Sequence, residues 1–159
     1  MLINAKEQFY IIFQNPILIA CIFSWFSAQF IKTVIKLFSG RVHSIKELFE
    51  LLLWRTGSMP SSHAALVACL CISIGFHSGF DSDVFVLALG LYLITVRDAV
   101  GVRRSNGIHG KMINVIGKAL DDRKIVSFSP IKEVQGHTPM EVIIGSLLGF
   151  INGLAFSVL

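Results

Sequence analysis

The stretch RTGSMPSSHAALVACLCISIGF, residues 55–76, starts with polar side chains and continues as an almost unbroken apolar run. From Pro60 to Phe80 the run is 21 residues long. As a helix this is about 31 Å, which matches the ~30 Å hydrocarbon core of a bilayer. A segment that only crossed a membrane would not need the polar residues at its start. Either they are the hydrated end of the span or they form a site: Arg55, Ser61, Ser62 and His63.

The composition indicates a membrane protein. Of the 159 residues, 53% are hydrophobic and only 15% are charged, whereas soluble domains usually carry about 25% charged residues. This length is enough for one domain, residues 1–159. A net charge of +4 would suggest nucleic-acid binding in a soluble chain. In a membrane chain it reflects basic loops, so no nucleic-acid partner is expected.

Four segments are apolar enough to cross a bilayer. They are residues 16–35, 60–80, 83–102 and 141–159. The third reaches a spanning length only if its helix continues beyond Val96 and includes Arg97 and Asp98. We therefore expect an all-α, polytopic membrane bundle of about four transmembrane helices. Short interfacial helices are expected at 44–54 and 108–120, and a flexible link at 121–130.

Lysines and arginines are concentrated in two loops. Of the 14 in the chain, the loop at 32–63 contains five and the loop at 97–140 contains eight, which leaves only Lys6. With four spans, both loops lie on one side, and the positive-inside rule makes that side cytoplasmic. The first apolar run lacks a cleavage pattern and is expected to be a retained span. We expect an integral protein of a bacterial inner membrane or an organelle membrane.

The fourth span carries a ridge of small residues. Gly145, Gly149 and Gly153 recur every four residues, which permits close approach of another helix. Ordinary packing within the bundle explains this ridge. Because the chain has only about four spans, a homodimer through the same face is the alternative.

The sequence MPSSH, residues 59–63, is typical of a helix start that binds an anion. Pro60 suits the first turn of a helix, where free N–H groups point outward from the positive end. Ser61 and Ser62 add hydroxyl donors, and His63 titrates near neutral pH. A plain helix cap with a histidine at the water line is the alternative.

The sequence HTPME, residues 137–141, has two interpretations. Thr138, Pro139 and Glu141 form a capping box with proline at the first helical position. This does not explain His137. If the helix starts slightly earlier, His137 and Glu141 are one turn apart, so the carboxylate can orient the imidazole. A purely structural pair is the alternative.

Cationic side chains occur near both histidine motifs. Arg103 and Arg104 have the planar fork that suits phosphate oxygens, although attraction to anionic lipid also explains them. Asp98, an acid near membrane depth, needs a partner, and these arginines are the obvious ones. Lys32 lies near the end of the first span, where snorkelling to the water is the alternative.

The whole inventory fits phosphoryl transfer without a metal or other cofactor. The sequence contains no cysteine or HxxEH metal-binding set, no Gly-x-Ser-x-Gly elbow and no Walker loop. It does contain two histidines, several cations and an N–H-rich helix start. A nucleophile, an acid for the leaving group and donors for the equatorial oxygens are the parts that this reaction needs.

Three strings resemble the divergent branch of the type 2 phosphatidic acid phosphatase superfamily, which is related to the vanadium-dependent haloperoxidases. They are GSMPSSHAAL (57–66), DAVGVRRSNG (98–107) and KEVQGHTPMEVIIGSLLG (132–149). The resemblance extends from about residue 25 to about residue 155. It implies a membrane-embedded hydrolase of the acid phosphatase type that cleaves a lipid phosphate or diphosphate ester through a phosphohistidine.

The resemblance also implies roles for individual residues. His63, in PSSH, matches the histidine of the PSGH motif and is the expected general acid. His137 matches the expected nucleophile, and Glu141 stands in place of the aspartate that orients it. Ile131 occupies the position where the third motif has arginine. Phosphate binding is therefore assigned to other residues: Arg103, Arg104, Lys32, Arg55, Ser61 and Ser62.

Two other functions remain open from the sequence. A catalytically silent protein that binds anionic lipid headgroups as a scaffold or assembly factor is favoured by Ile131 and by the incomplete first motif. A small transporter subunit would need polar residues through the full thickness of the membrane. The fourth span offers only Ser146 and Asn152, so this function ranks third.

Overall fold

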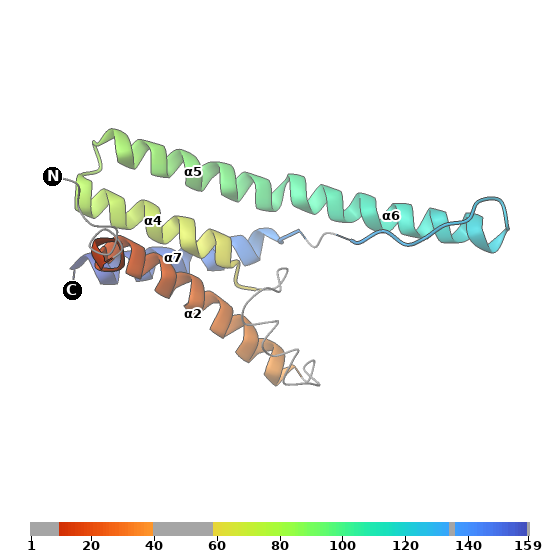
Figure 1. The fold of residues 1–159 in the computed structure, drawn as a ribbon, viewed down its shortest axis with the longest axis horizontal. Helices are drawn as coiled ribbons and strands as arrows, with labels where there is room; N and C mark the ends of the chain where they lie inside the picture. The colour runs from red at the N-terminus through yellow and green to blue at the C-terminus, as the bar shows by residue number, and fades with distance from the viewer. Residues whose placement is uncertain (1–9, 40–58, 134–135, 159) are drawn as a thin grey trace.

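The computed structural model describes residues 10–39, 59–133 and 136–158, and these form an all-helical structure (Figure 1). The long helices are α2 (Pro16–Phe38), α4 (Ser62–Ser78), α5 (Asp83–Val100), α6 (Val102–Asp122) and α7 (Pro139–Val158). Three apolar helical stretches are long enough to cross a membrane, namely Pro16–Phe38, Asp83–Asp122 and Pro139–Val158, and α4 is a shorter apolar helix. The predicted all-α class is confirmed. The predicted helix at 44–54 and Arg55 lie outside the described residues.

The helices start where the sequence provides caps. The Asn15 side chain accepts hydrogen bonds from the backbone N–H groups of Ile17 and Leu18, and Pro16 is the first residue of α2. At α4, the Ser61 hydroxyl oxygen accepts from Ala64 N. Both caps satisfy N–H groups that have no partner within their own helix. As expected, α5 runs on past Val96 to Val100.

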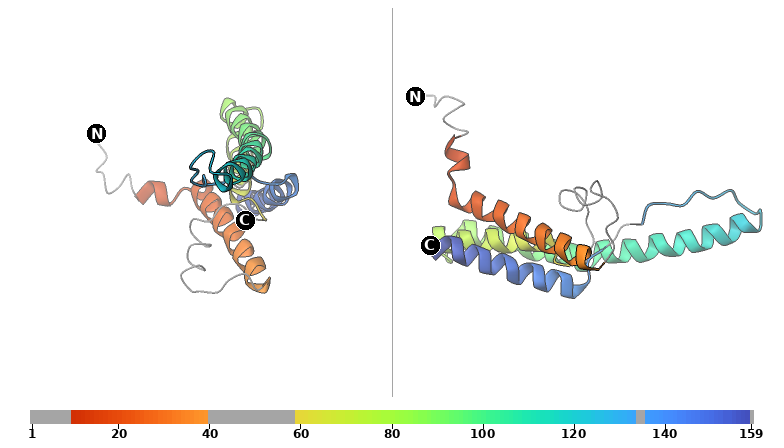
Figure 2. Two further views of the ribbon diagram at one scale, coloured as in Figure 1. Left: turned by 90° about the vertical axis from the view of Figure 1, so that its right-hand side faces the viewer. Right: turned by 90° about the horizontal axis from the view of Figure 1, so that it is seen from below.

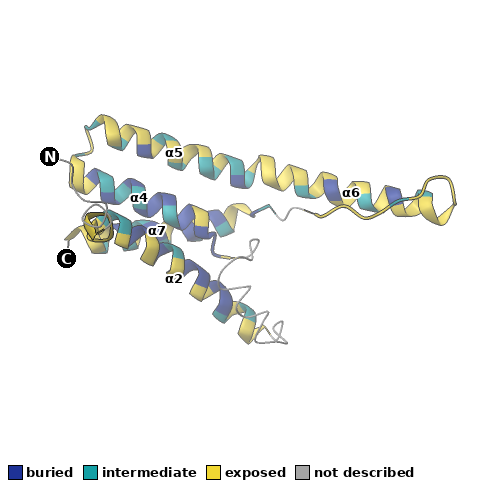
Figure 3. Ribbon diagram, in the orientation of Figure 1, coloured by how far each residue is buried: buried dark blue, intermediate teal, exposed yellow. Residues whose placement is uncertain are grey.

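Helix α4 is the centre of the bundle. It packs against α2, α5 and α7, most extensively against α7, and its residues are largely buried (Figure 3). On α7, a Cβ atom added to Gly145, Gly149 or Gly153 would come within 3.0 Å of the α4 backbone or of an α4 side chain. The glycine ridge therefore lets the two helices approach more closely than any side chain would allow.

The glycine ridge packs within the bundle, which is the first of the two interpretations that the sequence left open. It faces the carbonyl oxygens of Ser61, Ala65 and Cys69 at the start of α4 and along it. These three residues also recur every four positions, so each glycine meets one carbonyl. The homodimer through the same face stays a prediction.

Residues 108–120, predicted as a short interfacial helix, belong to the longer helix α6. It continues nearly in the direction of α5 and projects beyond the other helices (Figures 1 and 2). Hydrogen bonds continue across the junction at Gly101, which donates to Arg97 O and accepts from Ser105 N. The apolar side chains of its expected membrane face are exposed: Ile108, Met112, Val115, Ile116 and Ala119.

The expected flexible link at 121–130 instead packs on α6. Phe128 covers Gly117, where an added Cβ atom would meet the aromatic ring. Just beyond the link, the Asn114 side chain donates to Ile131 O at 3.0 Å and accepts from Ile131 N at 2.9 Å. These contacts return the chain along α6 toward the bundle.

We expect the substitution Gly149→Ala to destabilise the protein by about 1–3 kcal/mol, because the new Cβ atom overpacks the α4–α7 contact. Gly90→Ala on α5 is the matched control, since nothing lies within 4 Å of its added Cβ atom. Alanine at position 90 should be neutral or stabilising, because alanine is about 1 kcal/mol more favourable than glycine inside a helix. Thermal unfolding in detergent measures both. Equal stability of the two variants would contradict the close α4–α7 contact.

Candidate functional site

The polar ends of five helices meet at one end of the bundle. His63 at the start of α4 interacts electrostatically with Arg103, His137, Lys32 and Asp98. Lys32 on α2 interacts in turn with Glu141 on α7. These residues are far apart in the sequence but share one region of space. The structure thus brings together six of the predicted site residues.

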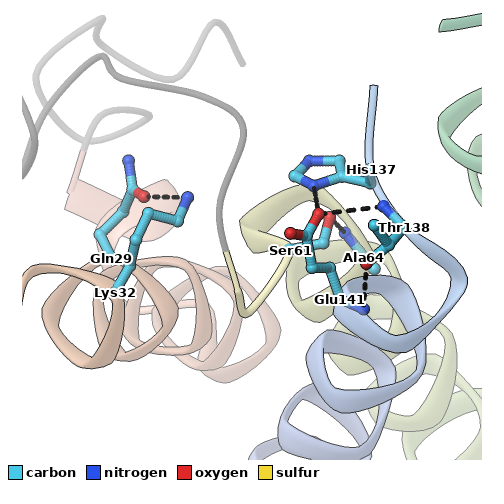
Figure 4. Close-up of polar contacts among 7 residues, drawn as sticks. All are labelled: Gln29, Lys32, Ser61, Ala64, His137, Thr138 and Glu141. Carbon is cyan, nitrogen blue, oxygen red and sulfur yellow. Dashed lines mark hydrogen bonds and ion pairs between the residues drawn. The ribbon is translucent and has the colours of Figure 1, made fainter. Parts of the chain in front are cut away.

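His137 and Glu141 form a largely buried pair within this cluster. The His137 Nδ1 atom lies 3.0 Å from Glu141 Oε2, and their side chains are 7% and 20% exposed. The same carboxylate oxygen accepts from the backbone N–H of Thr138 at 3.0 Å, while Glu141 N donates to Thr138 Oγ1 (Figure 4). The capping box and the oriented imidazole therefore coexist, because one carboxylate serves both.

The starts of α4 and α7 are joined by the backbone. Ser61 N donates to Glu141 O at 2.9 Å, and the glycine ridge begins directly below this bond at Gly145. Ser61 is fully buried and its hydroxyl caps α4, while Ser62 is buried as the first residue of that helix. The bond fixes the height of His63 relative to that of His137.

Lys32 is a cation with little exposure to water. It is 1% exposed, and its ammonium group donates to Gln29 Oε1 at 2.8 Å (Figure 4). Gln29 itself is 3% exposed. Burying a charge beside one neutral amide is costly unless other groups compensate for it. The Glu141 carboxylate on α7 is a negative charge that acts on this ammonium group.

Arg103 connects the start of α6 to the cluster. Its Nε atom donates to Asp98 Oδ2, which confirms the expected arginine partner for this acid. The guanidinium has five N–H donors, so the donors on its two terminal nitrogens can still bind an oxyanion. Arg103 and Asp98 lie at the surface, with side chains 53% and 37% exposed.

Gly136 brings the arginines to His137. An added Cβ atom at Gly136 would come within 3.0 Å of the backbone of Arg103 and Arg104. Two backbones can approach this closely only at a glycine, because any other residue has a Cβ atom in the way. Sequence reasoning placed the arginines at the site but did not identify Gly136. The sequence feature that could have identified Gly136 is its place directly before His137 of the motif.

Arg104 and Ile131 are not part of the buried cluster. The side chain of Arg104 is exposed, and its backbone is what contacts Gly136. Ile131 lies on the segment that returns along α6, where its backbone is held by Asn114. Within the described ranges, no three His, Cys, Asp or Glu side chains converge as metal ligands would.

Comparison with known proteins gives two matches. A profile described as "Divergent PAP2 family" matches residues 13–152. The chain is 33% identical over 141 residues to a Bacillus subtilis (strain 168) protein described as "Uncharacterized membrane protein YuiD", a match that covers 82% of this chain and 86% of that protein. No solved structure matches. The relative and the apolar helices together identify an integral membrane protein.

We expect Lys32→Met to abolish stabilisation by inorganic phosphate. A bound ligand stabilises the folded state by about 2.7 kcal/mol at a hundred times its Kd, and removing the buried ammonium removes the main reason for phosphate to bind. Without phosphate, the loss of the buried charge and the loss of the donor to Gln29 Oε1 have opposite effects, so the variant should still fold. Thermal unfolding with and without phosphate measures this.

The matched control is Lys118→Met on the exposed surface of α6. It should keep the phosphate-induced stabilisation of the original protein. If Lys32→Met also keeps it, Lys32 is not part of an anion site.

Proposed function

The chain belongs to the divergent PAP2 family, and from this premise we propose that it is a membrane-embedded phosphatase. Its substrate is a lipid that carries a phosphate or diphosphate ester, and the reaction proceeds through a phosphohistidine. One observation carries the proposal. His63 at the start of α4 and His137 just before α7 interact electrostatically with each other, and Arg103 and Lys32 act on His63 as well.

The hydrogen bond to Glu141 determines which atom of His137 attacks. A carboxylate only accepts hydrogen bonds, so the Nδ1 atom beside it carries the proton and the lone pair lies on Nε2. Figure 4 draws this second ring nitrogen on the side away from Glu141. The carboxylate also stabilises the positive charge that the imidazole gains as it bonds to phosphorus.

The reaction then takes place in two steps. His137 Nε2 attacks phosphorus, the bond from phosphorus to the lipid oxygen breaks, and His63 donates a proton to that oxygen. In the second step His63 takes a proton from water, the water oxygen attacks the phosphohistidine, and inorganic phosphate leaves. His137 is restored with its lone pair on Nε2.

Cations around the phosphoryl group lower the barrier of both steps. Lys32 and Arg103 approach from α2 and α6, and the N–H groups at the start of α4 point from the positive end of a helix. Arg104 and Ser62 are further donors beside this position. Arg55, which lies outside the described residues, keeps its predicted role in phosphate binding.

We place this site at the cytoplasmic surface of the membrane, in a bacterial inner membrane or an organelle membrane. The proposal follows from the charge distribution, because with the four predicted spans all of the basic residues except Lys6 fall on the side that carries the site. Basic loops remain on the cytoplasmic side of a membrane protein. A lipid phosphate in that leaflet has its headgroup at the same depth.

The alternative is a catalytically silent protein that binds anionic lipid headgroups. Ile131 favours it, since the position that carries arginine in the wider superfamily is apolar and lies away from the cluster. The two functions differ in outcome. A silent protein would be stabilised by phosphate through Lys32 yet release no phosphate from any ester.

We expect His137→Ala to lower the turnover of a phosphorylated lipid by several orders of magnitude, since the nucleophile is lost. His109→Ala is the control, because this histidine lies exposed on α6, and it should leave turnover unchanged. Phosphate release from mixed micelles measures both variants. A labelled, acid-labile phosphoprotein should form in the control and not in His137→Ala. Undiminished turnover in His137→Ala would refute the assignment.

We expect His63→Ala to slow hydrolysis of an alkyl phosphate by about 10²–10⁴-fold, the usual contribution of a general acid. A nitrophenyl phosphate needs no proton on its leaving oxygen, so its phosphorylation step should be slowed far less. The ratio of burst rates for the two esters measures the effect. An equal loss for both esters would exclude His63 as the acid.

A further inference from the structure

A groove runs along α4 between α2 and α5. Both of these helices pack on α4, but among the described helices they do not contact each other. The face of α4 between these two helices lines the groove, and its residues recur at the three- and four-residue spacing of a helical stripe. The stripe consists of His63, Leu66, Val67, Leu70, Ile74 and Ser78.

The upper part of the groove belongs to the polar cluster. A hollow of about 460 Å³ is lined there by His63, Asp98 and Arg103 together with apolar side chains of three helices. Trp25 of α2 forms one wall and Ile94 of α5 the other. This hollow is polar where the phosphate would bind and apolar directly beside it.

The lower part is almost purely apolar. A hollow of about 630 Å³ continues along α4 past Leu70 and Ile74, between Leu18 of α2 and Val84 at the start of α5. Leu66 lines both hollows, so they form one groove. From His63 to Ser78 the helix rises about 22 Å, most of the ~30 Å apolar core of a bilayer.

We propose that this groove, defined by the α4 stripe and its two walls, binds the hydrocarbon chain of a phosphorylated lipid whose phosphate lies at His63 and Arg103. The inference rests on the proposed function for the site at its upper end. Charge and shape both select this occupant. Arg103 attracts an anion at one end, while the remaining length offers mostly apolar contact to a long chain.

The lipid then reaches the site from within the membrane. Because α2 and α5 stay apart along the whole groove, a chain can move sideways from the surrounding lipid into contact with α4. The phosphate stays at the level of the headgroups during this movement. A short, water-soluble phosphate ester would occupy only the polar end, so the groove should discriminate between substrates by chain length.

Trp25 provides a direct measurement of binding. The chain has two tryptophans, so a Trp54→Phe protein fluoresces from Trp25 alone. A phosphonate lipid with brominated chains is not hydrolysed, and it should quench Trp25 to saturation at a low mole fraction. The same brominated chains under a phosphocholine headgroup should quench weakly and in proportion to their mole fraction. Equal quenching by both lipids would mean bulk lipid only and would overturn the proposal.

Competition distinguishes the kind of chain. Unbrominated phosphatidic acid or a long-chain prenyl phosphate should relieve the quenching, and whichever acts at the lower concentration identifies the preferred chain. Relief by neither would overturn the groove as a specific site. This readout does not require catalysis, so it decides the proposal even if the protein hydrolyses no ester.

Filling the groove tests its role in turnover. Ile74→Trp, in the lower part of the groove, should reduce kcat/KM for a long-chain lipid phosphate by at least about tenfold, the effect of leaving roughly two methylene groups unburied. The chains of a dihexanoyl, water-soluble analogue are too short to reach Ile74 from the polar end, so its kcat/KM should fall far less. Leu147→Trp on the exposed face of α7 is the matched control and should affect neither substrate. An equal loss for both substrates in Ile74→Trp would overturn the groove as the chain site.

Discussion

The close contact between α4 and α7 is the constraint on which the rest of the structure depends. Three glycines on α7 face three carbonyl groups on α4, and Ser61 N donates to Glu141 O where the two helices begin. Since a helix is rigid along its length, this contact sets the relative height of the two starts. His63 and His137 lie at those starts, so a packing feature in the apolar core determines the geometry of the polar site.

The site combines structural and functional demands in the same atoms. The Glu141 carboxylate caps α7 through Thr138 N and contacts His137 Nδ1. A capping group is already held in place by the helix, so the imidazole is oriented without a further loss of side-chain freedom. Gly136 has a comparable double function, because it ends the segment that returns along α6 and lets His137 approach Arg103. Structural and functional interpretations of such motifs are therefore not alternatives.

Sequence reasoning succeeded where local rules decide and failed where tertiary contacts decide. The cap at Thr138 and the pairing of Asp98 with an arginine depend on neighbours within a few residues. The partner of the glycine ridge is not decided by such neighbours. The spacing of the glycines fits a second copy of the chain as well as it fits α4. The direction of α6 depends on how Gly101 joins two helices, and amphipathic periodicity cannot reveal it. The groove results from two helices that do not meet, which no pattern in either of them encodes.

The buried ammonium of Lys32 connects stability with ligand binding. A chain selected only for stability would place an apolar residue at this depth, since a charge with one neutral partner costs free energy. The cost is tolerable if an anion spends much of its time nearby, because binding then offsets it. Lys32 faces the same cluster as His63 and lies one helix away from the stripe of α4 that lines the groove. The buried charge of Lys32 thus lies close to where an anionic headgroup and its chain would both find complementary groups, which is the arrangement expected of a site that is completed by its lipid.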